Sequence, residues 1–550
     1  MKMKDFDTFG VMIDMSRNAV MSLPGLKRFM TLLKKMGYNC VMLYTEDTYE
    51  VDGEPYFGYM RGRYTKEEMK EIDAFASELG MTVIPCIQTL AHLNAIFRWG
   101  QYPNDCDDIL LVDDERTYTL IDNMMKTLSE CFTSRRIHIG MDEAHSLGRG
   151  KFLDKHGYER VNEILKRHLA RVMEIAARYG YEVMAWSDMY FRSWNNGIAR
   201  IPRCTVPEEI VRSVPKELIP VYWDYYQKSE DAYSGMMENH RQFSDKTWFA
   251  GGSWCWYGMI PFNKYTIETM LPAIDACRKN NIRNAFMTMW GDDGAECSHF
   301  SQLSSLYYIA QYARGERDEE RIKAGFERLV GIGYDEFESI DLPNEVVPYN
   351  TPGEILNEGS PVNPSKYMLY SDYFNGYLDY TVREGAGEKY KEYSETLRRV
   401  ARKSRRYGYV FETAARLCDV LAVKYELGVR TRRAYRSGDR DALRALLKNE
   451  YARLPGLIDA FGRAFEKQWF CDNKPHGFDV QDHRIGALIR RTEACRRRLS
   501  DYLDGSIDAI PELEEELLPY GNAGESISLN KAVLYSTVNI VYQSSVTREK

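Results

Sequence analysis

Short β-rich runs alternate with amphipathic helical stretches from residue 9 to about residue 300. Eight such runs occur, over residues 9–14, 38–44, 81–87, 136–140, 181–187, 219–224, 247–252 and 284–290. Between them, helical spacing places apolar side chains on one stripe, as with Val161, Leu165, Leu169, Val172 and Ile175. Eight strand-helix repeats predict a closed (β/α)8 TIM barrel, an α/β fold whose catalytic groups lie at the carboxyl ends of the strands.

The periodicity changes after the barrel pattern ends. Five prolines between residues 343 and 364 are typical of an extended connector, and the chain beyond is helical in pattern. We therefore predict a catalytic barrel over 1–335, a proline-rich linker over 336–366 and a mainly α-helical C-terminal domain over 367–550. Long amphipathic helices indicate a bundle or an oligomer interface, and a homodimer is expected.

Two segments of the C-terminal region depart from the helical pattern. Residues 470–488 contain Pro475 and Gly477 beside several charged side chains, which fits either a loop that closes over a site or a solvated polar turn. Residues 531–545 carry an apolar pattern that fits a final strand.

Composition excludes several classes of protein. The chain has 81 acidic and 73 basic residues, a net charge of -8, so nothing in its charge indicates a nucleic-acid partner. It has no apolar run long enough for a signal peptide or a membrane span, so a cytoplasmic protein without a membrane partner is expected. The 11 cysteines form no C-x-x-C pair, which argues against a disulfide framework and a zinc ribbon.

The chemistry concentrates in RIHIGMDEAH, residues 136–145, where two adjacent carboxylates follow a short apolar strand. Alternation along that strand would direct His138 and Asp142 inward and Met141 outward. Glu143 would then lie at the mouth of the barrel. Trp, His or acidic residues follow nearly every other strand as well.

Three interpretations of the Asp142-Glu143 pair compete. A helix cap accounts for a lone pair but not for the residues at the other strand ends. A metal site made of His138, Asp142, Glu143 and His145 lacks a recognised ligand spacing, so no metal or cofactor is expected. Glycoside hydrolysis needs two carboxyl groups, and adjacent ones straddle a sugar poorly, which favours the variant in which the substrate's 2-acetamido oxygen is the nucleophile.

These residues carry a family resemblance. HIGMDEA resembles the H-x-G-G-D-E signature of glycoside hydrolase family 20, the β-N-acetylhexosaminidases. GVMIDMSR, IPCIQTLAHL and MTMWGDDGAE resemble that family's first, third and eighth barrel strands, so the similarity covers about residues 8–310. The helical C-terminal region resembles that of the subgroup of small intracellular members.

The resemblance implies a role for each matching residue. Glu143 would be the general acid/base, Asp142 would orient the acetamide, and His92 and His138 would support the pair. The sugar pocket would take its walls from Trp186, Trp256 and Trp290, its hydroxyl contacts from Asp292 or Glu296, and its acetamide contact from Tyr225 or Tyr257. Phe9 stands where the family usually has an arginine for the sugar's outer hydroxyls, and Arg17 on the same segment would replace it.

The predicted function is therefore a retaining exo-β-N-acetylhexosaminidase that removes terminal β-linked GlcNAc or GalNAc from a small glycan or glycoconjugate. Two alternatives stay open at this point. One is another barrel β-glycosidase that does not need the acetamide, and the other is a catalytically silent sugar-binding barrel.

Overall fold

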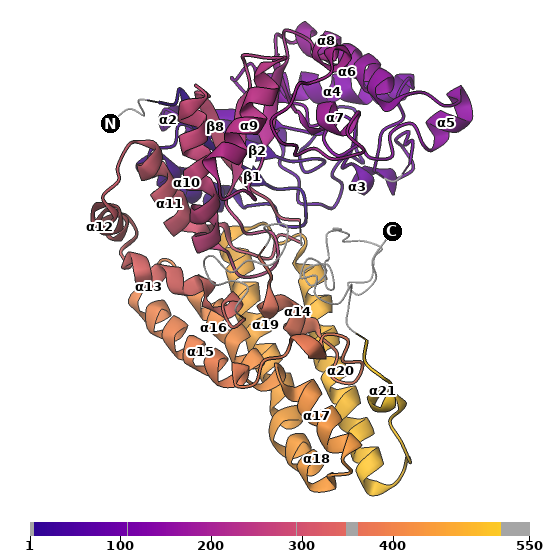
Figure 1. Ribbon diagram of the computed structural model, residues 1–550, viewed down its shortest axis with the longest axis vertical. Coiled ribbons are helices and arrows are strands. Elements are labelled where there is room, and N and C mark those ends of the chain that lie inside the picture. The colour runs from indigo at the N-terminus through magenta and orange to yellow at the C-terminus, as the bar shows by residue number, and fades with distance from the viewer. Residues whose placement is uncertain (1–4, 107, 293, 348–360, 519–550) are drawn as a thin grey trace. The chain divides into compact units, whose positions relative to one another are not determined.

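The computed structural model describes residues 5–106, 108–292, 294–347 and 361–518 (Figure 1). Eight parallel strands close into a barrel in the order of the sequence, which confirms the predicted fold. The strands are β1 (Thr8–Asp14), β2 (Cys40–Tyr44), β3 (Thr82–Cys86), β4 (Arg136–His138), β5 (Glu182–Trp186), β6 (Ile219–Trp223), β7 (Trp248–Gly252) and β8 (Asn284–Met289). The barrel closes where β1 pairs with β8, from Thr8 opposite Asn284 to Ile13 opposite Met289.

Helices follow the strands in the expected alternation. Their bounds are α1 (Leu23–Met36), α2 (Lys66–Glu78), α3 (Asn94–Phe97), α4 (Glu115–Cys131), α5 (Lys151–His156), α6 (Val161–Arg178), α7 (Asp188–Arg192), α8 (Glu208–Ser213), α9 (Glu230–Arg241), α10 (Asn263–Lys279) and α11 (Leu303–Ala313). Local signals fix the ends: Thr65 and Glu68 form a capping box at the start of α2, and Gly37 ends α1 at φ 112°.

Strand β4 is shorter than its sequence pattern suggests, and this shapes the site. Gly140 and Met141 adopt φ values of 74° and 73°, so the alternation ends at His138 and no longer assigns a face to Met141. A β-carbon at Gly140 would lie 1.9 Å from the side-chain oxygen of Gln88, so this position requires glycine. The sharp turn brings Asp142 and Glu143 next to the end of β3.

The chain divides into two compact units. The first comprises Met1–Ser253, Thr266–Trp290 and Leu306–Asp318, and the second Trp254–Tyr265, Gly291–Ser305 and Glu319–Lys550. The predicted boundaries at residues 335 and 366 remain predictions. Residues 348–360 of the proline-rich linker and all of the predicted final strand at 531–545 lie outside the described residues.

The second unit is helical in its described part. Its helices are α12 (Glu319–Val330), α13 (Tyr334–Glu338), α14 (Pro364–Tyr370), α15 (Ala386–Lys403), α16 (Gly408–Lys424), α17 (Leu427–Arg436), α18 (Arg440–Leu446), α19 (Ala452–Asp472), α20 (Phe478–Asp504) and α21 (Pro511–Glu514). Helices α15, α16, α19 and α20 pack in succession, each against the next (Figure 1). The interruption predicted over 470–488 is confined to residues 473–477, because α20 already begins at Phe478.

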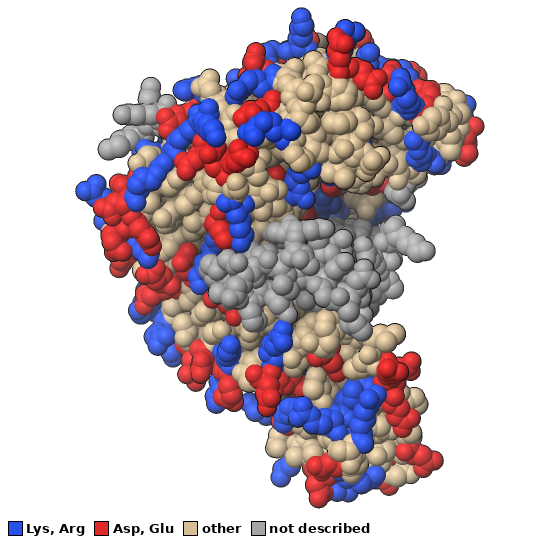
Figure 2. All heavy atoms as spheres, in the orientation of Figure 1, with Lys and Arg blue, Asp and Glu red and all other residues tan. Residues whose placement is uncertain are grey.

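The surface carries both signs of charge. Figure 2 shows acidic and basic side chains interspersed over the face in view, in keeping with the small net charge. Within the described residues, every helix is too short or too polar to cross a bilayer.

Candidate active site

Asp142 is buried and held on both of its carboxylate oxygens. The Gln88 amide nitrogen, two residues beyond β3, donates to Asp142 Oδ1 at 2.7 Å, and His92 Nε2 lies 3.3 Å from Oδ2. The amide oxygen of Gln88 also accepts from the backbone N–H of Met141, so one side chain fixes both the turn and the carboxylate. Glu143, in contrast, has a side chain that is 38% exposed. The two neighbouring acids therefore have different environments.

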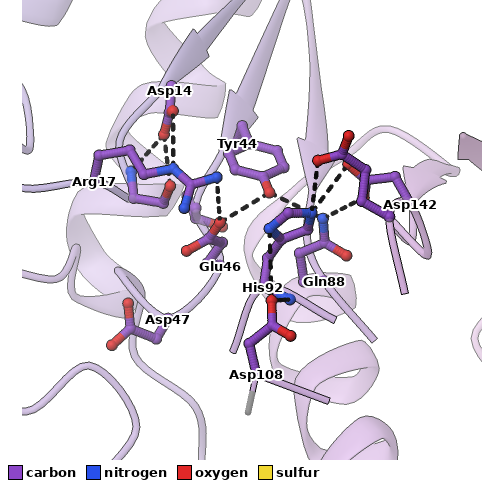
Figure 3. Close-up of polar contacts among 12 residues, drawn as sticks. Asp14, Arg17, Tyr44, Glu46, Asp47, Gln88, His92, Asp108 and Asp142 are labelled. Carbon is purple, nitrogen blue, oxygen red and sulfur yellow. Dashed lines mark hydrogen bonds and ion pairs between the residues drawn. The ribbon is translucent and has the colours of Figure 1, made fainter. Parts of the chain in front are cut away.

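A continuous network links Asp142 to the end of β1 (Figure 3). Gln88 donates to the Tyr44 hydroxyl at 2.9 Å, and that hydroxyl donates to Glu46 Oε1 at 2.9 Å. Arg17 lies 3.4 Å from the same Glu46 oxygen and 3.8 Å from Asp14. Arg17 is thus connected with Asp142 through residues at the ends of two successive strands, β2 and β3.

His92 and Asp142 form an ion pair. Burial lowers the pKa of His92, but the Asp142 carboxylate outweighs burial and raises that pKa to about 10. Burial likewise favours neutral Asp142, yet His92 and the hydrogen bond from Gln88 hold its pKa below the usual value. Near neutral pH, His92 is a cation and Asp142 a carboxylate.

Two other carboxyl groups of the site titrate near neutrality. Burial raises the pKa of Glu46 to about 7, although Arg17 and His92 oppose the shift. Burial also raises the pKa of Asp188, with help from the charges of Asp142 and Glu143, to about 7. Perturbed carboxyl groups around one pair of acids are typical of a catalytic centre.

Aromatic rings lie beside this network at the ends of the barrel strands. Trp290 contacts Tyr44 edge-on at 4.9 Å between ring centroids, and Trp186 lies 5.9 Å from Trp290. His138 lies 4.3 Å from Trp186, and its Nδ1 accepts from the Gly140 amide. Burial lowers the pKa of His138 to about 3, so the ring is neutral. Flat apolar rings of this kind suit the C–H faces of a sugar.

Family models match most of the chain. Residues 9–234 match the model described as "Glycosyl hydrolase family 20, catalytic domain", and residues 335–530 match "Glycoside Hydrolase 20C C-terminal domain". The chain belongs to glycoside hydrolase family 20. Membership assigns the chain to a family of glycoside hydrolases. Separately, the described residues contain no cluster of three His, Cys, Asp or Glu side chains suited to a metal ion.

Curated relatives of this family 20 chain include Hexosaminidase D of Bos taurus, 23% identical over 347 residues, which are 56% of this chain and 92% of the relative. Hexosaminidase D of Homo sapiens is 23% identical over 36% of this chain and 41% of its own length. A beta-hexosaminidase of Vibrio furnissii is 30% identical over 23% of this chain and 24% of its own length.

Solved structures similar to the family 20 chain include the exo beta-N-acetylglucosaminidase of Vibrio harveyi in complex with N-acetylglucosamine. That match has 16% identity and a TM-score of 0.46, and covers 61% of this chain and 58% of the other. The beta-N-acetylhexosaminidase of Streptomyces coelicolor gives 18% identity and a TM-score of 0.43, over 60% and 70% of the two chains.

The structure brings most of the predicted site residues of this family 20 chain into the first unit. Asp142, Glu143, His92, His138, Arg17, Trp186 and Trp290 are in the contacts described above. Tyr225 also lies in this unit, after β6, with its ring stacked on Trp223 at 5.6 Å. Among the described contacts, His138 packs against Trp186 and accepts from the Gly140 amide, and its support of the acidic pair remains a prediction.

Four predicted residues belong to the second unit: Trp256, Tyr257, Asp292 and Glu296. Trp256 stacks on Trp254 at 4.1 Å, and the carbonyl of Tyr257 accepts from Asn363. Both carboxylate oxygens of Glu296 accept from cations of the same unit, Lys366 at 2.6 Å and Arg484 at 3.0 Å. Their roles toward the sugar remain predictions.

Sequence reasoning assigned no role to five residues near the two acids, although four of them stand out by type at strand ends: Tyr44, Glu46, Gln88, Asp188 and, without such a signal, Arg192. The first three and Asp188 lie at the ends of β2, β3 and β5, where the barrel rule directs attention. Arg192 carried no such signal, because it lies six residues beyond Trp186 in a short helix.

Proposed function

We propose that this chain is a retaining exo-β-N-acetylhexosaminidase that removes terminal β-linked GlcNAc or GalNAc from a small glycan or glycoconjugate. The observation that carries the proposal is the contrast between the two adjacent acids. Asp142 is a buried carboxylate held on both oxygens, whereas Glu143 is accessible from solvent. One acid is therefore suited to a fixed electrostatic role and the other to proton transfer.

In the first step, protonated Glu143 donates its proton to the glycosidic oxygen. The carbonyl oxygen of the substrate's 2-acetamido group attacks C1, the C1–O bond breaks, and an oxazolinium ion forms. Asp142 accepts a hydrogen bond from the acetamido N–H and stabilises the positive charge that develops there. The His92 and Gln88 contacts keep Asp142 ionised and correctly oriented for this task.

In the second step, the Glu143 carboxylate takes a proton from a water molecule that attacks C1. The ring of the oxazolinium ion opens, the acetamide is restored, and the product keeps the β configuration because C1 is inverted twice. No cofactor takes part in either step. The same residue acts first as acid and then as base, so it must stay accessible to leaving group and water.

The other predicted residues would bind the sugar. Trp186 and Trp290 would contact its apolar face, together with Trp256. Arg17 and Asp292, or Glu296, would bind outer hydroxyls, and Tyr225 or Tyr257 would bind the acetamide oxygen. The choice between GlcNAc and GalNAc depends on these hydroxyl contacts, because the two sugars differ only at C4.

The test is release of p-nitrophenol from the β-GlcNAc, β-GalNAc and β-glucose glycosides. We expect turnover of the acetamido substrates alone, with a loss of about 10²-fold or more in Glu143→Gln from removal of general acid catalysis. Glu174→Gln, an exposed residue of α6, is the matched control and should keep full activity. A thiazoline mimic of the oxazoline should inhibit tightly.

Equal cleavage of the glucoside would support a β-glycosidase that does not need the acetamide. Binding of the sugars without any hydrolysis would support the silent sugar-binding barrel. Either result would reject the proposed function.

Assembly and location form a separate part of the proposal. The amphipathic helices of the C-terminal region favour a homodimer, which light scattering at working concentration would reveal as twice the 64.0 kDa chain mass. We also propose a cytoplasmic enzyme, a location that fractionation of the source cells tests directly.

A further inference from the structure

Two residues of the short helix α7, Asp188 and Arg192, bind Glu143. All three guanidinium nitrogens of Arg192 are engaged: Nε donates to Asp188 Oδ2 at 2.8 Å, Nη1 to the carbonyl of Gly197 at 2.8 Å, and Nη2 to Glu143 Oε1 at 3.2 Å. Two of these contacts fix the guanidinium plane, and the third is directed at Glu143. The Arg192 side chain is 16% exposed, so solvent competes weakly for these bonds.

Asp188 completes the arrangement by binding the backbone of the same residue. Its Oδ2 atom accepts from the Glu143 N–H at 3.2 Å while also accepting from Arg192. Glu143 has a φ of 50°, a left-handed conformation that costs a non-glycine residue on the order of 1 kcal/mol. The hydrogen bond from the Glu143 N–H to Asp188 thus stabilises this backbone conformation.

We propose that Asp188 and Arg192 act together as positioning residues for the general acid Glu143. Asp188 binds the backbone N–H of Glu143, and Arg192 binds the Glu143 carboxylate. The inference rests on the proposed function, because it assigns the two residues to the proton-transfer step of that reaction. Neither residue touches the substrate in this scheme.

The charges around Glu143 support this assignment over a purely structural one. Oε1 faces Arg192, and Oε2 lies 4.0 Å from His92 Nε2, so the carboxylate sits between cations from α7 and from the loop after β3. The negative charges of Asp142 and Glu143 both contribute to the raised pKa of Asp188, so the three carboxyl groups interact electrostatically. A residue needed only for folding would have no reason to face the exposed carboxylate of the acid.

Positioning of an acid has a kinetic signature that lost stability does not share. A poor leaving group departs only with a proton, whereas a phenol of low pKa departs with little help. Misplacing the acid should therefore slow poor leaving groups far more than good ones, and a misplacement of about 1 Å can cost 10²-fold.

The experiment measures kcat/KM of Arg192→Gln for GlcNAc linked to 2,4-dinitrophenol, to p-nitrophenol and to a second GlcNAc. We expect a loss of about 10²-fold on the disaccharide and only a few-fold on the dinitrophenyl glycoside. Asp188→Asn should show the same trend, and Glu143→Gln, measured in parallel, sets the full scale. Arg212→Gln is the matched control, because Arg212 pairs with Glu208 at the same i, i+4 spacing on the exposed helix α8.

A loss of equal size on all three substrates, or no loss, would overturn the proposal. So would a rise in KM at an unchanged kcat on all three substrates, which would make Arg192 a substrate ligand. If Arg192→Gln does not fold, Arg192→Lys decides, since lysine keeps the charge but cannot reach Asp188, Gly197 and Glu143 together. Wild type that cleaves none of the glycosides would reject the proposed function and this inference with it, whereas active wild type with unselective variants rejects the inference alone.

Discussion

Two clusters of buried charge, one in each unit, follow barrel strands and yet differ in kind. After β4, Asp142 is held by His92 and Gln88 while its neighbour Glu143 remains 38% exposed. After β8, Glu296 binds Lys366 and Arg484, and the three side chains are at most 4% exposed. The first cluster is open, in that one of its carboxylates is exposed to solvent, and the second is closed, in that all of its charged groups are buried.

The difference in exposure and pairing suits the first cluster to proton exchange, whereas the second is a closed network of ion pairs. Around Asp142, carboxyl groups with pKa values raised to about 7 lie near one whose pKa is lowered. Such uneven environments allow one acid to exchange protons while another stays ionised. Around Glu296, each oxygen has a cationic donor and solvent is excluded, so proton exchange there would leave a buried charge without its partner.

The sharpest way to break this comparison is Glu296→Gln. Removing the carboxylate leaves Lys366 and Arg484 buried without their anion, and breaking a buried ion pair from one side costs about 3–5 kcal/mol. Thermal unfolding should show a clear drop in Tm, with Glu395→Gln, an exposed residue of α15, as the control. Reduced kcat/KM at an unchanged Tm would instead make Glu296 a sugar ligand and remove the distinction.

Asp142→Asn tests whether the open cluster needs the charge of its buried carboxylate. An asparagine keeps the shape but loses the charge that stabilises the oxazolinium ion, so kcat should fall by about 10²–10³-fold, or roughly 3–4 kcal/mol. Because Asp142 acts on the nucleophile, the loss should persist with a dinitrophenyl leaving group, unlike that of Glu143→Gln. Recovery of Asp142→Asn on the activated substrate would contradict the separation of roles.

The fold was predictable from the sequence because its signals are local. Each of the eight strands follows from a short apolar run, and the barrel rule then directs attention to the strand ends. The limits of β4 were not predictable, since the left-handed turn at Gly140 and Met141 depends on contact with Gln88, about 50 residues earlier. Alternation along a strand says nothing about where a tertiary contact ends it.

The partners of charged residues were hidden for the same reason. The place of Glu296 after β8 predicts a sugar ligand but does not reveal its partners Lys366 and Arg484, which lie 70 and 188 residues further along the chain. Arg192 has no motif of its own, and its importance follows only from the meeting of α7 with the turn after β4. Sequence patterns located Asp142, Glu143 and Glu296, but only three-dimensional contacts show which of them are paired and buried.

The smallest expected effect distinguishes two histidines of the first unit, His92 and His138. The folded-state pKa of His92 is raised from 6.5 to about 10, so its stabilising contribution is complete below pH 6.5 and disappears as the pH rises toward 10. For His92→Gln we expect a Tm a few degrees below wild type at pH 6, corresponding to on the order of 1–2 kcal/mol, and little difference at pH 10.

His138→Gln should behave in the opposite way. The folded-state pKa of His138 is lowered to about 3, so only the unfolded chain binds its proton between pH 6.5 and pH 3, and this histidine costs stability as the medium becomes acidic. The variant should therefore lose less stability than wild type on acidification. Comparing each variant with wild type at the same pH cancels the titration of distant groups. If the difference in Tm from wild type varied with pH in the same way for both variants, His92 would be neutral too. The contact between His92 and Asp142 would then be a neutral hydrogen bond and not the ion pair that keeps Asp142 ionised.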